Sequence, residues 1–367
     1  MLFTKALRDK ILAPLQTVSG IVERRHTLPI LSNVLIEKKG SQLTFLATDI
    51  EIQIRTSSVV EEGSDAAVTV SAKKLQDILR ALPESGEIAL NLDDKKLTVK
   101  SGKSRFSLQT LPADDFPRMS PPQGDSKVIT LAQSALRKLL SQTQFSMASQ
   151  DVRYYLNGLL MVVDGNQLKT VATDGHRLAF SSVGIEGSFD KKEVIIPRKT
   201  VIELNRLLSD SDSEVKVELA GNQARFVFGE VELVSKLIDG KFPDFERVIP
   251  QSTRNNISLS RQDLQHSMQR ASILTNEKFR GVRLVIADNS LKIVAANADQ
   301  EEAQEELEIQ YQGEALDIGF NVGYLLDVLG NSNAEVVQWG FNDSNSSALV
   351  TIPGNDNFKY VVMPMRI

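Results

Sequence analysis

The chain has 367 residues, of which 41% are hydrophobic and 24% charged, and its net charge at pH 7 is −5. A chain of this length exceeds the size at which one hydrophobic core stops growing, so two or three domains are expected. The composition excludes disordered and fibrous classes. The apolar stretches are too short to span a bilayer, and the charged N-terminal segment does not resemble a secretory signal.

Cysteine is absent from the sequence. Its absence excludes disulfides, thiolate metal sites and a cysteine nucleophile, and it suits a reducing compartment. We therefore expect a cytoplasmic protein. The negative net charge by itself argues against tight nucleic-acid binding. Whether the protein binds nucleic acid therefore depends on how the charge is distributed along the chain.

One pattern occurs three times in the sequence, in copies that begin at Asn33, Asn157 and Gly281. Each copy is an apolar strand, a turn containing Gly or Asn, and a second alternating strand that ends in Ala-Thr-Asp or Ala-Ala-Asn. Chance is the alternative explanation for three similar hairpins alone in a strand-rich protein.

Two markers separate a true repeat from chance. Thr48-Asp49 returns 125 residues later as Thr173-Asp174, and Phe116-Pro117 returns 126 residues later as Phe242-Pro243. Because independent markers keep nearly the same interval, we interpret the chain as an internal repeat.

Helical patterns precede and follow each hairpin. The six predicted helices are Arg8 to Val18, Ala72 to Leu82, Leu131 to Gln144, Arg198 to Leu208, Arg261 to Leu274 and Val322 to Leu329. Ser71 and Ser260 are typical N-caps, Pro197 opens the fourth helix and Gly330 closes the sixth. The sequence thus predicts an α+β fold of three tandem units of about 120 residues, each with two helices.

Basic residues are concentrated on and just beside these helices. The first four helices each carry a net +2, the fifth +1 and the sixth −1, so the helices hold about +8 and the remainder about −13. Charged solvent faces are common on single helices, but five basic helices in an acidic chain are not. On one side of the molecule they would neutralise phosphates without reading sequence.

The width of duplex DNA sets how many helices a ring would need. Helices packed side by side lie about 10 Å apart, so six in a circle put opposite axes only about 19 Å apart. A duplex about 20 Å across does not fit. Twelve helices give about 38 Å between axes and, after one helix diameter of about 10 Å is subtracted, a bore of about 28 Å. Two chains are therefore required.

Long segments along the whole chain resemble one family. They are LPILSN from Leu28, SRFSLQTLPADDFP ending at Pro117, QFSMASQDVRYYLNG from Gln144, TVATDGHRLA ending at Ala179, TNEKFRGVRL from Thr275, and VVMPMRI at the C-terminus. Through them the sequence resembles the β subunits of bacterial DNA polymerase III, the sliding-clamp family. The resemblance implies clamp domains at residues 1–122, 128–245 and 250–367, in a head-to-tail homodimeric ring with helices inside and antiparallel sheets outside.

The family resemblance also implies a function. The protein would be a processivity factor that encircles duplex DNA without sequence specificity. It would tether the replicative polymerase and other DNA-processing proteins, and an ATP-dependent clamp loader would open the ring. It would need no cofactor or metal. The implied DNA contacts are Arg25, Lys73, Gln150, Tyr154 and Tyr155; Lys73 stands where an arginine is common in the family and lacks its bidentate fork. Strand packing is the alternative role for the two tyrosines.

A hydrophobic pocket between the second and third domains is also implied by the family resemblance, as the site where partners insert a short linear motif. The corresponding residues are Arg153, Leu156, Thr173, Gly175, His176, Arg177, Leu178, Pro243, Arg247, Val248, Asn321, Tyr324, Val361, Met363, Pro364, Met365 and Arg366. Two adaptable methionines beside a proline near the terminus agree with such a site, although ordinary core is the alternative. Asn345 and Ser347 lie on the neighbouring loop, and Asn345 is more polar than the family often shows.

The subunit interface is predicted from opposite charges in the first and third repeats. The first repeat offers Lys103, Arg105, Phe106 and Leu108, and the third offers Ile273, Leu274, Glu301, Glu302, Glu305 and Glu306. An open strand edge at each end invites pairing, and opposite charges favour head-to-tail closure. A solvated acidic face is the alternative for the glutamates.

An enzyme and a scaffold that binds only proteins are the two alternatives to a clamp. An enzyme would use Asp49 and Asp174, with His176 beside the second, but the same Thr-Asp in two copies suits a structural turn better. His26, His176 and His266 lack metal-ligand spacing, and the sequence has no phosphate-binding loop, dinucleotide fingerprint or nucleophile elbow. A scaffold that binds only proteins would not need basic helices.

Overall fold

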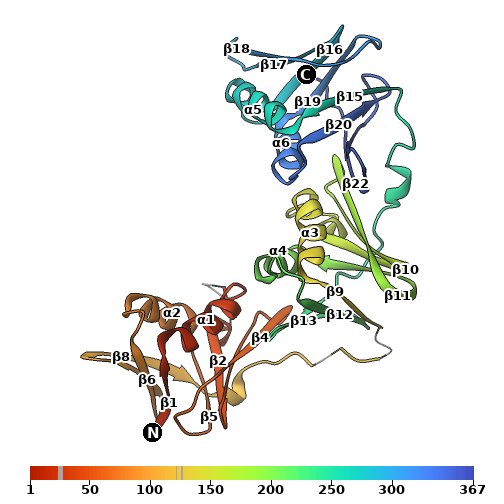
Figure 1. Ribbon diagram of the computed structural model, residues 1–367. Helices are drawn as coiled ribbons and strands as arrows, with labels where there is room; N and C mark the ends of the chain where they lie inside the picture. Colours follow the sequence, from red (N-terminus) through yellow and green to blue (C-terminus); the bar gives the residue numbers. More distant parts are fainter. Residues whose placement is uncertain (24–27, 121, 125–126) are drawn as a thin grey trace. The chain divides into compact units, whose positions relative to one another are not determined.

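The structure is a computed structural model that describes residues 1–23, 28–120, 122–124 and 127–367 (Figure 1). It divides into two compact units, residues 1–136 with 202–237 and residues 137–201 with 238–367. Antiparallel sheets dominate both units. In the described part of the chain, no helix is both long and apolar enough to cross a membrane.

The predicted helices are confirmed with shifts of at most three residues at their ends. They are α1 (Arg8–Ser19), α2 (Ala72–Ala81), α3 (Gln133–Thr143), α4 (Arg198–Leu207), α5 (Arg261–Ala271) and α6 (Val322–Gly330). Ser71 caps α2 by accepting from the Lys74 amide at 3.4 Å, and Ser260 caps α5 by accepting from the Asp263 amide at 3.3 Å. Ser272–Leu274, predicted as the end of α5, forms a separate 3-10 turn.

One twelve-stranded sheet forms the body of the first unit. Its strands are β1 (Leu2–Leu7), β2 (Asn33–Lys39), β3 (Gln42–Thr48), β4 (Ile52–Val59), β5 (Ala66–Ser71), β6 (Glu87–Asp93), β7 (Lys96–Ser101), β8 (Ser104–Leu111), β9 (Lys127–Ala132), β12 (Glu214–Ala220), β13 (Gln223–Phe228) and β14 (Val231–Lys236). The order is β1-β6-β7-β8-β5-β2-β3-β4-β14-β13-β12-β9. The pairing of β4 with β14 therefore joins the first repeat to the second.

Helix α1 packs on this sheet through an apolar stripe at helical spacing. Ile11, Leu15 and Val18 are fully buried, and the helix contacts β3, β4 and α2. Pro14 lies inside α1 and cannot donate to the Lys10 carbonyl. The Ser58 hydroxyl of β4 donates to that oxygen at 2.6 Å instead, which ties the helix to the sheet at its proline.

Two sheets form the second unit. The six-stranded sheet has the order β10 (Gly158–Thr173), β11 (Arg177–Pro197), β22 (Asn355–Val362), β21 (Ala348–Ile352), β20 (Val336–Phe341) and β15 (Asn255–Ser260). The four-stranded sheet has the order β18 (Glu302–Glu308), β17 (Ser290–Ala296), β16 (Gly281–Ala287) and β19 (Leu316–Asn321). The pairing of β11 with β22 joins the second repeat to the third.

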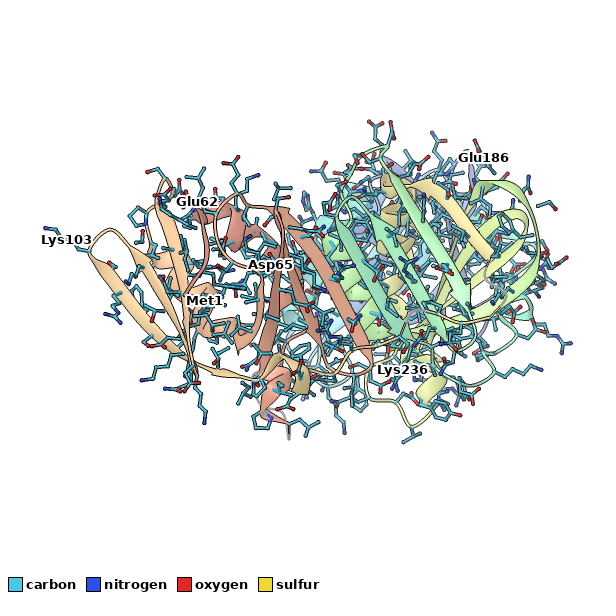
Figure 2. The ribbon with its side chains drawn as sticks, turned by 90° about the horizontal axis from the view of Figure 1, so that it is seen from below. Met1, Glu62, Asp65, Lys103, Glu186 and Lys236 are labelled. Carbon is cyan, nitrogen blue, oxygen red and sulfur yellow. The ribbon has the colours of Figure 1, made fainter. Side chains whose placement is uncertain are left out.

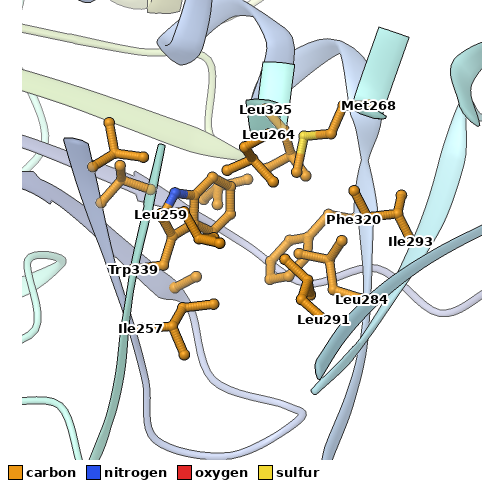
Figure 3. Close-up of a cluster of buried hydrophobic side chains, with 14 of the residues drawn as sticks. Ile257, Leu259, Leu264, Met268, Leu284, Leu291, Ile293, Phe320, Leu325 and Trp339 are labelled. Carbon is orange, nitrogen blue, oxygen red and sulfur yellow. The ribbon is translucent and has the colours of Figure 1, made fainter. Parts of the chain in front are cut away.

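The core of the third repeat lies between its two sheets and helices α5 and α6. Trp339, Phe320, Met268 and Leu325 are all buried there (Figure 3). Sheet residues enter this core at alternate positions and α5 contributes residues four apart, Leu264 and Met268, as expected for the two periodicities.

Removing the Phe320 ring should test how far the third repeat depends on this core. We expect Phe320→Ala to lower the free energy of unfolding by about 3–5 kcal/mol, because the site is fully buried and a cavity remains. Val285→Ala, on the outer face of β16, is the control and should cost about 1 kcal/mol or less. Urea denaturation of both variants measures the difference; equal losses would contradict the assignment.

Candidate functional site

A pocket of about 410 Å³ lies in the second unit, where β11 and β22 meet the segment that follows β14. It is lined by Arg153, Tyr155, Leu156, Thr173, Gly175, His176, Arg177, Leu178, Phe242, Pro243, Phe245, Val248, Ser347, Val361 and Met363. Its floor is apolar, since Leu156, Leu178, Phe242, Phe245 and Val361 pack in one buried cluster. Such a concave apolar site with polar groups at its rim is typical of ligand binding.

The β11–β22 pairing places two of the floor residues. Leu178 and Val361 are direct cross-strand partners, so their side chains share one face of the sheet. The chain continues past β22 without losing contact, because the Met363 amide donates to the His176 carbonyl at 2.9 Å. The Met365 amide then donates to the Gly319 carbonyl at 2.8 Å, which directs the terminal residues away from the pocket floor.

The opposite wall comes from the segment that carries the repeated Phe-Pro. Phe242 and Phe245 are buried, whereas Val248 is 46% exposed. The ring of Phe245 stacks on Phe180 of β11, with centroids 6.1 Å apart. The connecting segment is thereby fixed against the sheet, and the pocket exists as a preformed cavity.

Arg153 forms a charged rim. Its guanidinium donates to both carboxylate oxygens of Asp151, at 3.0 and 2.8 Å, and to the Asp174 carbonyl at 3.2 Å. The hydrogen bonds from Arg153, first from its side chain and then from its backbone amide, lower the pKa of Asp151 to about 2. The rim therefore keeps a fixed cation and anion at neutral pH.

Gly175 allows Arg153 to lie close to the backbone. Its φ is +90°, a left-handed conformation that side chains disfavour. A Cβ at this position would lie 2.9 Å from Nη1 of Arg153, so any larger residue would displace the guanidinium. The glycine is required here for both reasons.

Arg177 links the pocket to α6. Its guanidinium donates to Asp174 at 3.1 Å, to Asp327 at 2.5 Å and to the Phe145 carbonyl at 2.7 Å. The same group lies 4.4 Å from the centre of the Tyr324 ring. With a side chain only 9% exposed, Arg177 has a structural role beneath the pocket as well as a place in its lining.

The repeated Thr-Asp pairs are structural turns, as the sequence predicted. Asp174 accepts the amides of His176 and Arg177 at 2.9 and 3.1 Å. Asp49 accepts the amides two and three residues ahead at 3.0 and 2.9 Å in the same way. Carboxylates that cap their own turns twice, at equivalent positions, are unsuited to acid-base catalysis.

Eleven of the seventeen predicted pocket residues line the cavity. They are Arg153, Leu156, Thr173, Gly175, His176, Arg177, Leu178, Pro243, Val248, Val361 and Met363. The other six lie outside the lining: Arg247, Asn321, Tyr324, Pro364, Met365 and Arg366. Of these, Tyr324 lies against Arg177, and Arg247 is ion-paired with Asp244 at 2.8 Å.

Phe242 and Phe245 line the pocket but were not among the predicted residues. The repeated Phe-Pro marker could have drawn attention to Phe242. Ser347, expected on the neighbouring loop, also lines the cavity, whereas Asn345 is exposed outside it. Tyr155 lines the pocket too, although the sequence suggested a DNA contact.

The remaining predicted DNA contacts are spread over both units. Arg25 lies outside the described residues. Lys73 is exposed on α2 and pairs with Asp77 at 2.5 Å. Gln150 is exposed with φ +58°, and Tyr154, 59% exposed, makes an edge contact with Tyr155 at 5.8 Å.

Part of the positive charge expected on the helices is turned inward. Arg8 donates to the Leu82 carbonyl, and Arg198 donates to the Met147 carbonyl, each at 2.9 Å. Arg261 donates to the Ala334 carbonyl at 2.9 Å. These cations satisfy backbone oxygens near helix ends. The helical charge of about +8 therefore overstates what faces solvent, while the exposed cations are Lys10, Lys73, Lys74, Arg80, Arg137, Lys138, Arg206 and Arg270.

The predicted interface residues lie on or next to two strand edges. Residues 104–109 of β8 pair only with β7, and Lys103 projects from the tip of that hairpin (Figure 2). At the other end, β18 is the outer strand of its sheet and carries Glu302 and Glu305. Ile273, 76% exposed, lies in the 3-10 turn that contacts β18.

Family models for the DNA polymerase III beta subunit match nearly all of the chain. The N-terminal domain model matches residues 1–120, the central domain model residues 130–244 and the C-terminal domain model residues 246–366.

Individual relatives and solved structures agree with these models. The beta sliding clamp of Pseudomonas aeruginosa is 49% identical over 362 residues, and that of Escherichia coli is 46% identical over 361, each match covering 98% of both chains. The crystal structure of the DNA polymerase III subunit beta from Pseudomonas aeruginosa superposes with a TM-score of 0.94 at 48% identity over 100% of both chains. A Caulobacter crescentus beta sliding clamp gives 0.93 at 36% identity, covering 99% of this chain and 98% of that one.

The ion pair between Arg153 and Asp151 predicts a measurable shift in the pKa of Asp151. We expect Arg153→Ala to raise the pKa of Asp151 from about 2 toward its ordinary value of 3.8, because the side-chain hydrogen bonds are lost. Since the folded pKa is lowered, the pair stabilises the fold above about pH 4 and this contribution fades toward pH 2. Carboxyl-carbon NMR follows the titration, with Arg247→Ala as the control. An unchanged midpoint in Arg153→Ala would contradict the assigned cause.

Proposed function

The chain belongs to the DNA polymerase III beta subunit family and acts as a sliding clamp, and we propose that two copies close head to tail around duplex DNA. The ring holds DNA without reading its sequence and tethers the replicative polymerase and other DNA-processing proteins. We place its three clamp domains at residues 1–122, 128–245 and 250–367. The protein is an accessory subunit with no catalytic role.

The ring proposal rests on the strand pairing that joins one repeat to the next. Within the chain, β4 of the first repeat pairs with β14 of the second, and β11 of the second pairs with β22 of the third. The third repeat leaves β18 as an outer strand, and residues 104–109 of β8 have an open edge in the first. A third junction of the same kind, between two subunits, uses both edges and closes the ring.

Charge and apolar surface at the two edges support this junction. The β8 edge carries Lys103, Arg105, Phe106 and Leu108, whereas the other edge carries Ile273, Leu274, Glu301, Glu302 and Glu305. Among the described residues, the ion pairs include neither Lys103 nor Arg105, and none involves Glu301 or Glu302. These charges are therefore available to another subunit and favour head-to-tail contact.

The exposed cations on α2 and α3, such as Lys73, Lys74 and Arg137, support contact with phosphates. Contacts of this kind carry no sequence information, so they permit sliding. Arg25, Gln150, Tyr154 and Tyr155 complete the proposed DNA-contacting set. An ATP-dependent loader would open the ring, and the cytoplasm, where the chromosome is replicated, is the proposed location.

The pocket is the proposed docking site for partner proteins. Its apolar floor suits the hydrophobic side chains of a short linear motif, and its charged rim at Arg153 suits an extended backbone or a carboxylate. A clamp from Pseudomonas aeruginosa bound to griselimycin superposes with a TM-score of 0.95 at 48% identity. We propose that all seventeen predicted residues belong to the docking site, eleven as its lining and six as its surroundings.

Encirclement is tested by topology. The protein is loaded with a clamp loader onto nicked circular DNA, which is then linearised in half of the sample. We expect gel filtration in moderate salt to retain the protein on circles but not on linear DNA, because a closed ring is held by linkage and slides off free ends. Equal retention on both forms would exclude the ring.

Partner docking is tested at the C-terminal segment. Deleting residues 363–367 should abolish binding of the replicative polymerase, because it removes Met363 from the pocket, yet it should leave dimerisation unchanged. Phe279→Ala, which removes an exposed ring outside the pocket, is the control and should bind normally. Surface plasmon resonance measures binding, and sedimentation velocity the dimer. Undiminished binding by the deletion variant would refute the site.

A further inference from the structure

Arg270 lies on α5 beside the open edge of β18, outside the set of residues assigned to the subunit interface. Its Nε donates to Oε1 of Glu305 at 2.9 Å and its Nη2 donates to Oε2 at 2.5 Å. Nη2 also donates to the hydroxyl of Ser267 at 3.0 Å, and Ser267 is buried. The guanidinium is therefore fixed in one plane by a bidentate carboxylate and a hydroxyl.

Glu305 differs from the other glutamates of β18 in the face that it occupies. Its cross-strand partner is Ile293, which is fully buried in the core of the third repeat (Figure 3). Glu302 and Glu306 point to the opposite face, because side chains alternate along a strand. The carboxylate of Glu305 is thus on the helix-covered face, where Arg270 neutralises it and lowers its pKa.

The side chains of β8 also alternate between the core face and the outer face of their sheet. Leu108 and Phe106 are the cross-strand partners of Leu97 and Val99, which are both fully buried, so they lie on the core face of their sheet. Arg105 lies on the outer face. Phe106 nevertheless remains 36% exposed, because the edge beside it is unpaired.

The junctions inside the chain keep core faces together. In the first junction Leu233 pairs with Ile54, and both are fully buried. In the second, Ala179 pairs with Tyr360, and both are fully buried in the core beneath the helices. A third junction that follows this rule puts the partner's Phe106 on the face of Glu305, and the partner's Arg105 on the face of Glu302 and Glu306.

This inference rests on the proposed dimer. We propose that Arg270 is a positioning residue of the subunit interface, which holds the Glu305 carboxylate neutralised and turns its guanidinium plane toward the partner's Phe106. A planar cation held in place by a carboxylate stacks well on an aromatic face. Without it, closure would cover an unpaired carboxylate with an aromatic ring, which is costly.

Four variants, with Phe106→Ala among them, test the proposal through the dimer Kd, measured by sedimentation equilibrium over a dilution series. We expect Arg270→Ala to raise Kd by at least about tenfold, since every ring contains the interface twice. Arg270→Ala combined with Glu305→Gln should recover much of the loss, because the stranded charge is removed. In a Phe106→Ala background, Arg270→Ala should have a much smaller effect than in the wild type.

The matched control is Arg283→Ala, which breaks the exposed ion pair with Asp317 across β16 and β19 on the outer face. It should leave Kd within about twofold of the wild type. Thermal unfolding of Arg270→Ala at monomeric dilution should match the wild type, which separates an interface role from a general loss of stability.

Three results would overturn different statements. A wild-type Kd in Arg270→Ala, with a weakened dimer in Phe106→Ala, would remove Arg270 from the interface and leave the ring intact. A weakened Arg270→Ala dimer that Glu305→Gln does not rescue would also reject the neutralising role. A wild-type protein that stays monomeric at micromolar concentration would instead refute the proposed dimer itself.

Discussion

Hydrogen bonding between strand edges is the interaction on which the rest of this molecule depends. A strand edge leaves backbone amides and carbonyls without partners, and each repeat has such edges. Two junctions satisfy them inside the chain, through β4 with β14 and β11 with β22. The pocket depends on the second junction, since Leu178 and Val361 share one face only in this register. The proposed ring closure would use the open edges of β8 and β18.

The two junctions inside the chain differ in the side chains that they bring together. Gln53 occupies the position in β4 that Leu178 occupies in β11, and its side-chain oxygen accepts the Met119 amide at 2.8 Å. Lys236 and Glu51 form an ion pair across that junction at 3.0 Å. Polar side chains thus bond locally at the first junction, whereas apolar side chains line the cavity at the second.

Periodicity and capping residues were enough to predict the six helices, and the repeated markers predicted three α+β units. Tertiary pairing was less accessible. Phe245 was missed because only its stacking on Phe180, far away in the sequence, brings it into the pocket. The charge count on the helices failed for Arg8, Arg198 and Arg261, since a sequence does not show which cations donate to backbone carbonyls. Structure that depends on residues close in sequence was predictable, whereas contacts between residues far apart in sequence were not.

The open edges of β8 and β18 also bear on solubility. An unpaired strand that carries apolar residues is a template for runaway association, and a separated subunit would expose both of these edges. Lys103 and Arg105 on one edge and Glu302 and Glu306 on the other repel a second copy of the same edge. We infer that the charges proposed to direct ring closure also act as gatekeepers, which would protect a separated subunit from aggregation.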